Sequence, residues 1–150
     1  MHGALGELAA ADDGAHRFLA CTIEQVGGEH PVYVHAKVGI VDDRWLTVGS
    51  ANLNEHSLFN DTEFNVVCRD PQLVRETRLR LWAEHLDRPV DELGGDPAEI
   101  VDTIWRPLAE EQLARRQSSA PLTHKLLRLP HVSRRSRRLL GPLQGFVVDG

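Results

Sequence analysis

The sequence predicts an α/β domain in which strands come first and helices follow. Apolar residues alternate and then become continuous over Val32–Val41, and a turn follows at Asp42–Arg44. Asp-Pro pairs, which are typical of helix starts, open two later segments at Asp70 and Asp96. The length of 150 residues and the hydrophobic content of 41% suit one domain with its own core.

The strand region covers roughly residues 17–69. Period-two patterns and turn residues predict four strands, at Phe18–Ile23, Val32–Val41, Trp45–Val48 and Glu63–Cys68. The second and third strands form a hairpin through the turn, and a short helix is expected at about Leu53–Leu58.

Two longer helices are expected after the strands. The first begins at Asp70-Pro71, ends near His85–Asp87, and places one set of residues on a common face: Leu73, Val74, Thr77, Leu81 and Trp82. The second begins at Asp96-Pro97, buries Ile100, Ile104 and Leu108, and is kinked or interrupted by Pro107.

Charge is distributed unevenly along the chain. The net charge is −5, yet no acidic residue occurs from Gln112 to Val148, where the basic residues are Arg115, Arg116, Lys125, Arg128, Arg134, Arg135, Arg137 and Arg138. Such a segment can meet an anionic membrane surface, although a cluster like Arg134–Arg138 is more often a solvated face. No apolar run of membrane-spanning length and no secretory signal pattern is visible, so we expect a cytoplasmic or peripheral membrane protein.

The residues that carry chemistry gather around the expected hairpin. His35 and Lys37 are two residues apart in a strand, so their side chains should project to the same face. The turn at Asp42 brings the chain back, and Gly49–Asn52 then ends near the level of His35. The first N–H groups of the short helix at Leu53–Leu58 should face the same hollow.

This set of side chains suits a phosphate diester. Lys37 offers a fixed positive charge to a non-bridging oxygen, and Ser50 and Asn52 offer neutral donors. His35 can act as nucleophile or as proton donor near neutral pH. No carboxylate cluster with metal-ligand spacing is visible, so we expect chemistry without a metal or another cofactor.

The spacing HxKx4Dx6GSxN, matched from His35 to Asn52, resembles the signature of the phospholipase D superfamily. The resemblance extends through Asn60–Glu63, although His56 stands where many relatives carry arginine. It implies an α/β fold with a mixed β-sheet flanked by helices. It also implies a phosphohistidine mechanism in which Glu63 accepts a hydrogen bond from the motif histidine. Asp42 would be a structural residue at the hairpin turn. The candidate catalytic residues are therefore His35, Lys37, Asp42, Ser50, Asn52 and Glu63, with phosphate held by Lys37, Ser50 and Asn52.

We divide the chain into three parts on this basis. Residues 1–15 are a flexible lead, rich in Ala and Gly, that could also be a frayed helix. Residues 16–90 are a phospholipase D-like catalytic half-domain. Residues 91–150 are a helical and basic extension of the same domain.

The sequence contains one such motif, whereas the family builds each active site from two. The chain could be the C-terminal half of a two-motif enzyme, or two copies could pair about a two-fold axis. We favour the first because a long extension follows the motif. Family precedent would then make His35 the acid and the absent histidine the nucleophile, although the residues themselves leave this assignment open.

The resemblance implies a phosphodiesterase that converts a phosphatidyl lipid to phosphatidic acid and an alcohol, or that exchanges the head group. Alternatives are a cardiolipin-synthase-like phosphatidyl transferase, a dimeric nuclease, and a non-catalytic fragment or oligomerisation module. Nucleic acid is disfavoured by the acidic net charge. The expected partners are a phospholipid substrate, a second motif-bearing half and an anionic membrane surface that meets the Arg-rich segment.

Overall fold

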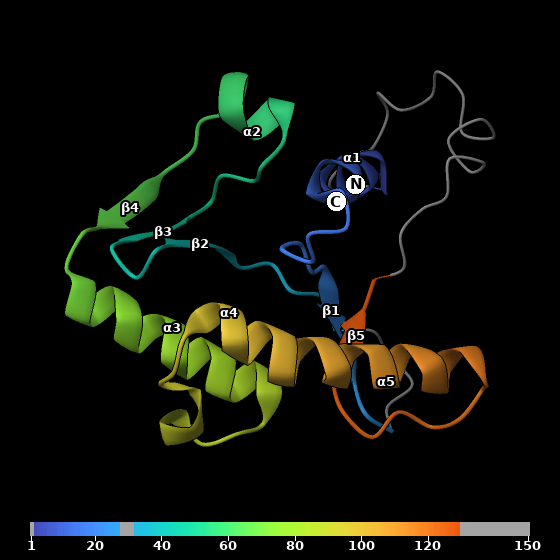
Figure 1. Ribbon diagram of the computed structural model, residues 1–150. Helices are drawn as coiled ribbons and strands as arrows, with labels where there is room; N and C mark the ends of the chain where they lie inside the picture. Colours follow the sequence, from blue (N-terminus) through green and yellow to red (C-terminus); the bar gives the residue numbers. More distant parts are fainter. Residues whose placement is uncertain (1, 28–31, 130–150) are drawn as a thin grey trace.

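The structure is a computed structural model that describes residues 2–27 and 32–129. Figure 1 shows helices α3 (Pro71–Leu86), α4 (Pro97–Ile100) and α5 (Arg106–Gln117) lying together along one side. The sheet formed by β2, β3 and β4 lies on the other side of the view, and α2 lies at the end remote from these helices. The remaining elements are α1 (His2–Asp12), β1 (Cys21–Ile23), β2 (Lys37–Val41), β3 (Trp45–Gly49), α2 (Glu55–Phe59), β4 (Asn65–Cys68), a 3-10 helix (Val90–Leu93), a π-helix (Val101–Trp105) and β5 (Leu126–Arg128).

The expected hairpin is confirmed. Strands β2 and β3 pair antiparallel from Val41 opposite Trp45 to the open end of the hairpin, and the amide of Arg44 donates to the carbonyl of Val41 (3.0 Å). Asp42 and Asp43 form the turn with positive φ angles of 51° and 52°. Asp tolerates this left-handed region, and a turn with two such residues matches the twist of the strands.

The strands form two small sheets rather than one. β3 pairs with β2 and β4 in a three-stranded sheet, while β1 pairs with β5. The α/β class is confirmed, whereas every pairing among the described strands is antiparallel rather than mixed. Connectivity explains the β2–β3 pair, since two strands joined by a tight turn can pair only antiparallel.

The strand expected at Val32–Val41 is shorter in the structure. It begins at Lys37, and residues 32–36 are exposed coil. Lys37 pairs with Gly49, the last residue of β3, and the chain turns away at Ser50. The residues before Lys37 therefore have no β3 partner, and apolar content alone does not make them a strand.

Both predicted helix starts are confirmed. The Asp70 side chain accepts from the amides of Gln72 (2.9 Å) and Leu73 (3.3 Å), and Asp87 ends α3 in the left-handed conformation. The helix that starts after Asp96 passes into the π-helix just before Pro107, so the predicted interruption is also confirmed.

The buried face of α3 differs from the expected one. The structure buries Val74, Arg78, Leu79 and Leu86, whereas half of Leu73 is exposed. The predicted face was based on the periodicity of apolar residues alone. Arg78 is buried because it meets a carboxylate from the sheet, a contact that periodicity cannot indicate.

The hydrophobic core lies among the helices. It contains Leu79, Leu86, Leu93, Ile100, Ala109 and Leu126, with Trp82 and Trp105 packed against it. In contrast, valines of the three-stranded sheet are exposed on both of its faces: Val38, Val48 and Val66 on one, Val41 and Val67 on the other. The described chain therefore buries its helices better than its sheet.

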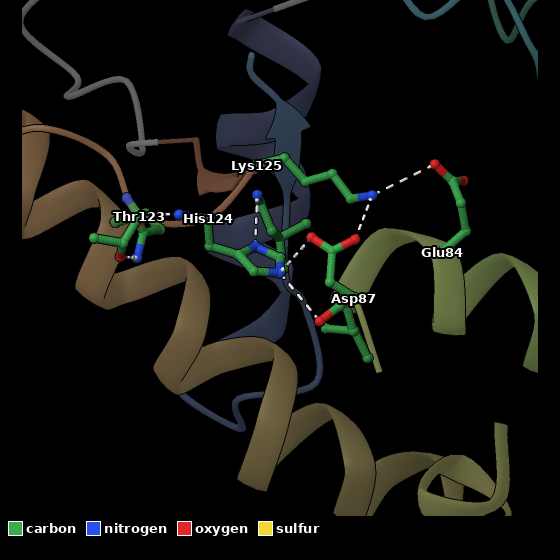
Figure 2. A network of polar contacts seen from close by, with 8 residues as sticks. Glu84, Asp87, Thr123, His124 and Lys125 are labelled. Atoms are coloured by element: carbon green, nitrogen blue, oxygen red, sulfur yellow. Dashed lines mark hydrogen bonds and ion pairs between the residues drawn. The ribbon is translucent and has the colours of Figure 1, made fainter. Parts of the chain in front are cut away.

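Polar contacts fix the strand β5 against α3 (Figure 2). His124 Nε2 lies 3.1 Å from the Leu86 carbonyl, and its Nδ1 accepts from the amide of Leu126 (3.0 Å). The Lys125 ammonium lies 2.8 Å from Asp87, whose carboxylate raises the pKa of the ammonium. This network holds the last described strand in place at the end of the helix.

The first residues form a helix in the structure. Of the two alternatives for residues 1–15, a frayed helix or a disordered lead, the described part is α1, which ends at Asp12. The Asp12 side chain then accepts from the amide of Arg17 (2.9 Å).

Candidate functional site

The hairpin brings Lys37 beside the Gly49-Ser50 turn. Lys37 is the register partner of Gly49 on β2, and Asn65 is its partner on β4. A Cβ atom at Gly49 would collide with the Asn65 amide and with the Phe64 carbonyl. Only glycine fits this central position, so the motif glycine has a steric reason in the fold.

Ser50 is the centre of a small hydrogen-bond network. Its amide donates to the Phe64 carbonyl (3.0 Å), and the Phe64 amide donates to Ser50 Oγ (3.0 Å). Ser50 Oγ in turn donates to Glu63 Oε2 (2.5 Å). The hydroxyl is thereby held in one orientation, and it connects the end of β3 to the residues that lead into β4.

Glu63 is held as a carboxylate. Hydrogen bonds from Ser50 and then Ser57 lower the pKa of Glu63, and the charge of Lys37 lowers it further. Ser57 is buried, although it lies on the short helix α2. A lowered pKa means that Glu63 stays ionised at neutral pH, so its side chain provides a fixed negative charge close to Lys37.

The Lys37 ammonium donates to the carbonyl oxygen of His35 (2.9 Å). An ammonium has three donors, so this bond uses one of them. The His35 ring is exposed and stacks on Tyr33, with ring centroids 5.7 Å apart. The structure thus brings His35 and Lys37 together through the backbone of one and the side chain of the other.

The expected bond from the motif histidine to Glu63 is not among the contacts of the described residues. The Glu63 carboxylate accepts from Ser50 and Ser57 instead. His35 lies in the coil before β2, and its side chain stacks on Tyr33. A strand through His35 would have set the direction of this ring, but β2 begins two residues later.

The segment after β3 contains the predicted site residue Asn52, and nearby hydrogen bonds of Asn54 and Asn65 that the sequence pattern did not indicate. Asn52 is half-buried, while Asn54 is the N-cap of α2 and accepts from the amide of Ser57 (2.8 Å). Asn65 accepts from the amide of Ala51 (3.3 Å). The Asn54 cap could have been found from the asparagine three residues before Ser57, a capping spacing.

Asp42 lies in the hairpin turn, but the adjacent Asp43 makes the tertiary contact. Arg78 Nε donates to Asp43 Oδ1 (2.6 Å) and Arg78 Nη2 donates to Asp43 Oδ2 (2.7 Å). The hydrogen bond and charge of Arg78 lower the pKa of Asp43. Sequence reasoning missed this pair because its residues are 35 positions apart.

The described part of the basic segment is paired within the protein. Arg115 meets Glu111, Arg116 meets Glu24, Lys125 meets Asp87 and Arg128 meets Glu110. These side chains therefore have acidic partners on the chain itself, which weakens the expectation of an anionic membrane contact here. The cluster Arg134–Arg138 lies outside the described residues.

Residues 2–27 and 32–129 contain neither a membrane-spanning helix nor a cluster of metal-binding side chains. No helix in these ranges combines the length and apolar character needed to cross a bilayer. No group of three or more His, Cys, Asp or Glu side chains there could hold a metal ion.

Chemically, the end of the hairpin presents an ammonium, a hydroxyl and a carboxylate side by side. The ammonium can neutralise an anionic oxygen, and the serine hydroxyl is already oriented by two partners. The Glu63 carboxylate accepts a hydrogen bond from the hydroxyl and balances the charge of the ammonium, and no residue of the helical layer takes part. This arrangement suits the binding of a phosphate group.

Part of the chain is similar to known proteins. The family "Cardiolipin synthase, PLD-like domain" matches residues 13–83. "Phospholipase D zeta 1" of Arabidopsis thaliana is 37% identical over 90 residues, which are 49% of this chain and 8% of that protein. "Phospholipase D A" of Dictyostelium discoideum is 42% identical over 73 residues, covering 37% of this chain and 6% of that protein.

"Phospholipase D alpha 1" of Cynara cardunculus is 34% identical over 119 residues, covering 66% of this chain and 14% of that protein. The chain thus spans a small part of the length of each of these relatives. The family match nevertheless includes the hairpin, the Ser50 network and most of α3. Residues 13–83 of this chain therefore form a phospholipase D-like domain, and the relatives that match the chain are phospholipase D enzymes.

Proposed function

We propose that this chain is one half of a phospholipase D-type phosphodiesterase that acts on phosphatidyl lipids. The observation that carries the proposal is the position of Lys37 beside the Ser50–Glu63 pair at the open end of the hairpin. The family match over the same residues supports the assignment of this end as a phosphate site.

The proposed roles follow from the chemistry of each group. Lys37 binds a non-bridging phosphate oxygen, and Asn52 donates a further hydrogen bond to the phosphate. Ser50 donates one as well when its hydroxyl hydrogen, which Glu63 accepts in this structure, turns toward the phosphate. Glu63 keeps Ser50 oriented and balances the charge of Lys37. Asp42 shapes the turn. His35 supplies the imidazole that attacks phosphorus or protonates the leaving alcohol.

The proposed reaction has two steps. In the first, one imidazole nitrogen bonds to phosphorus while the bond from phosphorus to the head-group oxygen breaks, and a second imidazole gives this oxygen a proton. In the second, water loses a proton to that second imidazole and bonds to phosphorus, and the phosphorus–nitrogen bond breaks. The products are phosphatidic acid and the alcohol.

The second imidazole requires a second motif-bearing half. Exposed apolar side chains support this part of the proposal: Tyr33, which stacks on His35, is 74% exposed, and Phe64 and Leu53, which flank the Ser50 turn in the pairing and in the sequence, are 74% and 100% exposed. Side chains of this kind are usually covered in a stable assembly. We favour a longer two-motif protein over a pair of identical chains, because the chain matches only a small part of its relatives.

The first experiment incubates the chain, alone and together with a second motif-bearing half, with phosphatidylcholine vesicles and, separately, with plasmid DNA, all in the presence of chelator. Release of choline and phosphatidic acid supports the proposal, and light scattering on the same sample establishes whether the active species is a dimer. His35→Asn removes the reacting nitrogen and is expected to abolish release while leaving the circular dichroism spectrum unchanged. Release by this variant at the rate of the parent chain would contradict the proposal, as would cleavage of DNA without lipid turnover.

A phosphatidyl transferase is the second candidate, favoured by the description of the matching family as a cardiolipin synthase domain. It shares the first step and differs in the acceptor, since a lipid or glycerol hydroxyl replaces water. Adding phosphatidylglycerol to the vesicles separates the two activities. Cardiolipin formed in excess of phosphatidic acid identifies a transferase, and phosphatidic acid alone identifies a hydrolase.

A further inference from the structure

We propose that Arg78 is a positioning residue for the candidate site, because its contact with Asp43 fixes the catalytic hairpin on helix α3. The inference rests on the proposed function for its effect on phosphate, but the positioning of the hairpin can be tested separately. Arg78 lies outside the motif from His35 to Asn52, and it belongs to a helix that contributes no group to the site itself.

The geometry of the pair is that of a rigid connection. Two nitrogens of the guanidinium meet the two oxygens of Asp43, at 2.6 and 2.7 Å, so the carboxylate cannot rotate without losing one bond. The guanidinium carbon also lies 4.5 Å from the centre of the Trp82 ring. Trp82 in turn packs edge-on against Trp105 and the hydrophobic core, which holds the position of the guanidinium.

The pair spans the two parts of the molecule. Asp43 lies at the tip of the hairpin, and the two strands β2 and β3 run from it to Lys37 and Gly49 at the other end. The sheet is poorly covered in the described residues, and Leu46 is its one buried hydrophobic residue there. A rotation of the hairpin about its tip would displace Lys37 and Ser50 together, and a displacement of about 1 Å is enough to reduce a reaction rate strongly.

The free-energy cost of burying the Arg78 side chain indicates that it does more than fill space in the interior. Its side chain is 6% exposed, and Nη1 is buried without a hydrogen-bond partner among the described residues. An apolar side chain would fill the same space without an unpaired nitrogen, and buried ion pairs are often no more stabilising than such a replacement. What the ion pair adds is a fixed direction, because the planar guanidinium donates both hydrogen bonds to the carboxylate in one plane only.

The test compares three variants of the full chain. Arg78→Met removes the fork and keeps much of the side-chain volume. Arg78→Lys keeps a positive charge but cannot form two parallel bonds, and it serves if the first variant does not fold. Arg80→Met is the matched control, because Arg80 is exposed on the same helix.

Two quantities are measured on each variant. The affinity for inorganic phosphate is obtained from amide chemical shifts of Lys37 and Ser50 during titration. Hydrogen exchange is followed for the amides of β2 and β3, with the amides of α3 as internal reference. Both Arg78 variants should lose about tenfold or more in phosphate affinity and exchange their hairpin amides about tenfold faster or more, with α3 amides unchanged. Arg80→Met should resemble the parent chain in both quantities.

Each outcome decides the inference. Arg78 variants with the phosphate affinity and the hairpin exchange of the parent would overturn it. If the parent chain itself binds no phosphate, the proposed function fails for the isolated chain, and the exchange data alone decide: faster hairpin exchange in the Arg78 variants supports positioning, and unchanged exchange overturns it. Equal losses in Arg80→Met would also overturn it, because the effect would then come from any charge removed from α3.

Discussion

The helical layer and the three-stranded sheet differ in how completely they are buried. Leu86 and Leu126 of the helical part are 2% and 1% exposed, whereas Val48 and Val66 of the sheet are 46% and 57% exposed. The candidate site lies on the sheet, so the proposed chemistry belongs to the less covered part. Regions with few buried apolar contacts open more readily than a core, and binding sites are commonly found there.

The helices and the three-stranded sheet are therefore stabilised by different contacts. The helices are stabilised by their own packing. The sheet is connected to them by few contacts, chiefly the Asp43–Arg78 pair and Leu46, and we propose that a second half covers the rest. The predictions below test whether stability and site geometry separate along this boundary.

The largest expected effect is on stability. Leu86→Ala should lower the free energy of unfolding by about 2–5 kcal/mol, because it leaves a cavity in the core. The matched control is Leu58→Ala on α2, where the same side chain is 55% exposed and the expected loss is below about 1 kcal/mol. Urea denaturation followed by circular dichroism measures both, and equal losses would show that the sheet region is as tightly packed as the core.

The second expected effect is a loss of activity without a loss of stability. Lys37→Ala should reduce turnover of a phosphatidyl lipid by roughly 10²–10³-fold, since the charge that stabilises the transition state is lost. The free energy of unfolding should change by less than about 0.5 kcal/mol, because Lys37 is partly exposed and lies outside the core. A large loss of stability would mean that this end of the sheet supports the fold.

A third, smaller effect concerns the glycine between the strands. Gly49→Ala should cost about 1–3 kcal/mol, because the new methyl group collides with Asn65 and Phe64. Hydrogen exchange should become faster in β3 and β4 while the amides of α5 keep their protection. If α5 amides lost protection equally, the two parts would unfold as one unit.

The smallest effect appears in acid. The pKa of Asp43 is lowered below its ordinary value of 3.8, first by the hydrogen bond from Arg78 and also by the charges of Arg78 and Arg75. The pair therefore adds stability at pH values above 3.8, and this contribution is lost as the pH falls through the lower pKa of the folded protein. Asp43→Asn should flatten this part of the curve of melting temperature against pH, whereas Asp61→Asn at an exposed site should leave it unchanged. An unaltered acid limb in Asp43→Asn would contradict the ionised pair.

Local sequence determined much of the secondary structure. Asp70-Pro71 and Asp96-Pro97 began helices because a carboxylate caps the first amides and proline fits the first turn. Asp42-Asp43 made the hairpin turn because Asp accepts positive φ. Each of these choices involves residues within four positions of one another, so the pattern alone was sufficient.

Tertiary structure decided the contacts that place the site. The start of β2 depended on where β3 ends. The partner of Glu63 depended on the direction of the His35 ring. The burial of Arg78 depended on Asp43, which lies in another part of the chain. These are pairings between distant residues, whose energy arises only when the chain brings them together. The residue types alone established which side chains are available for the proposed phosphate chemistry. Their positions and directions were established only by the fold.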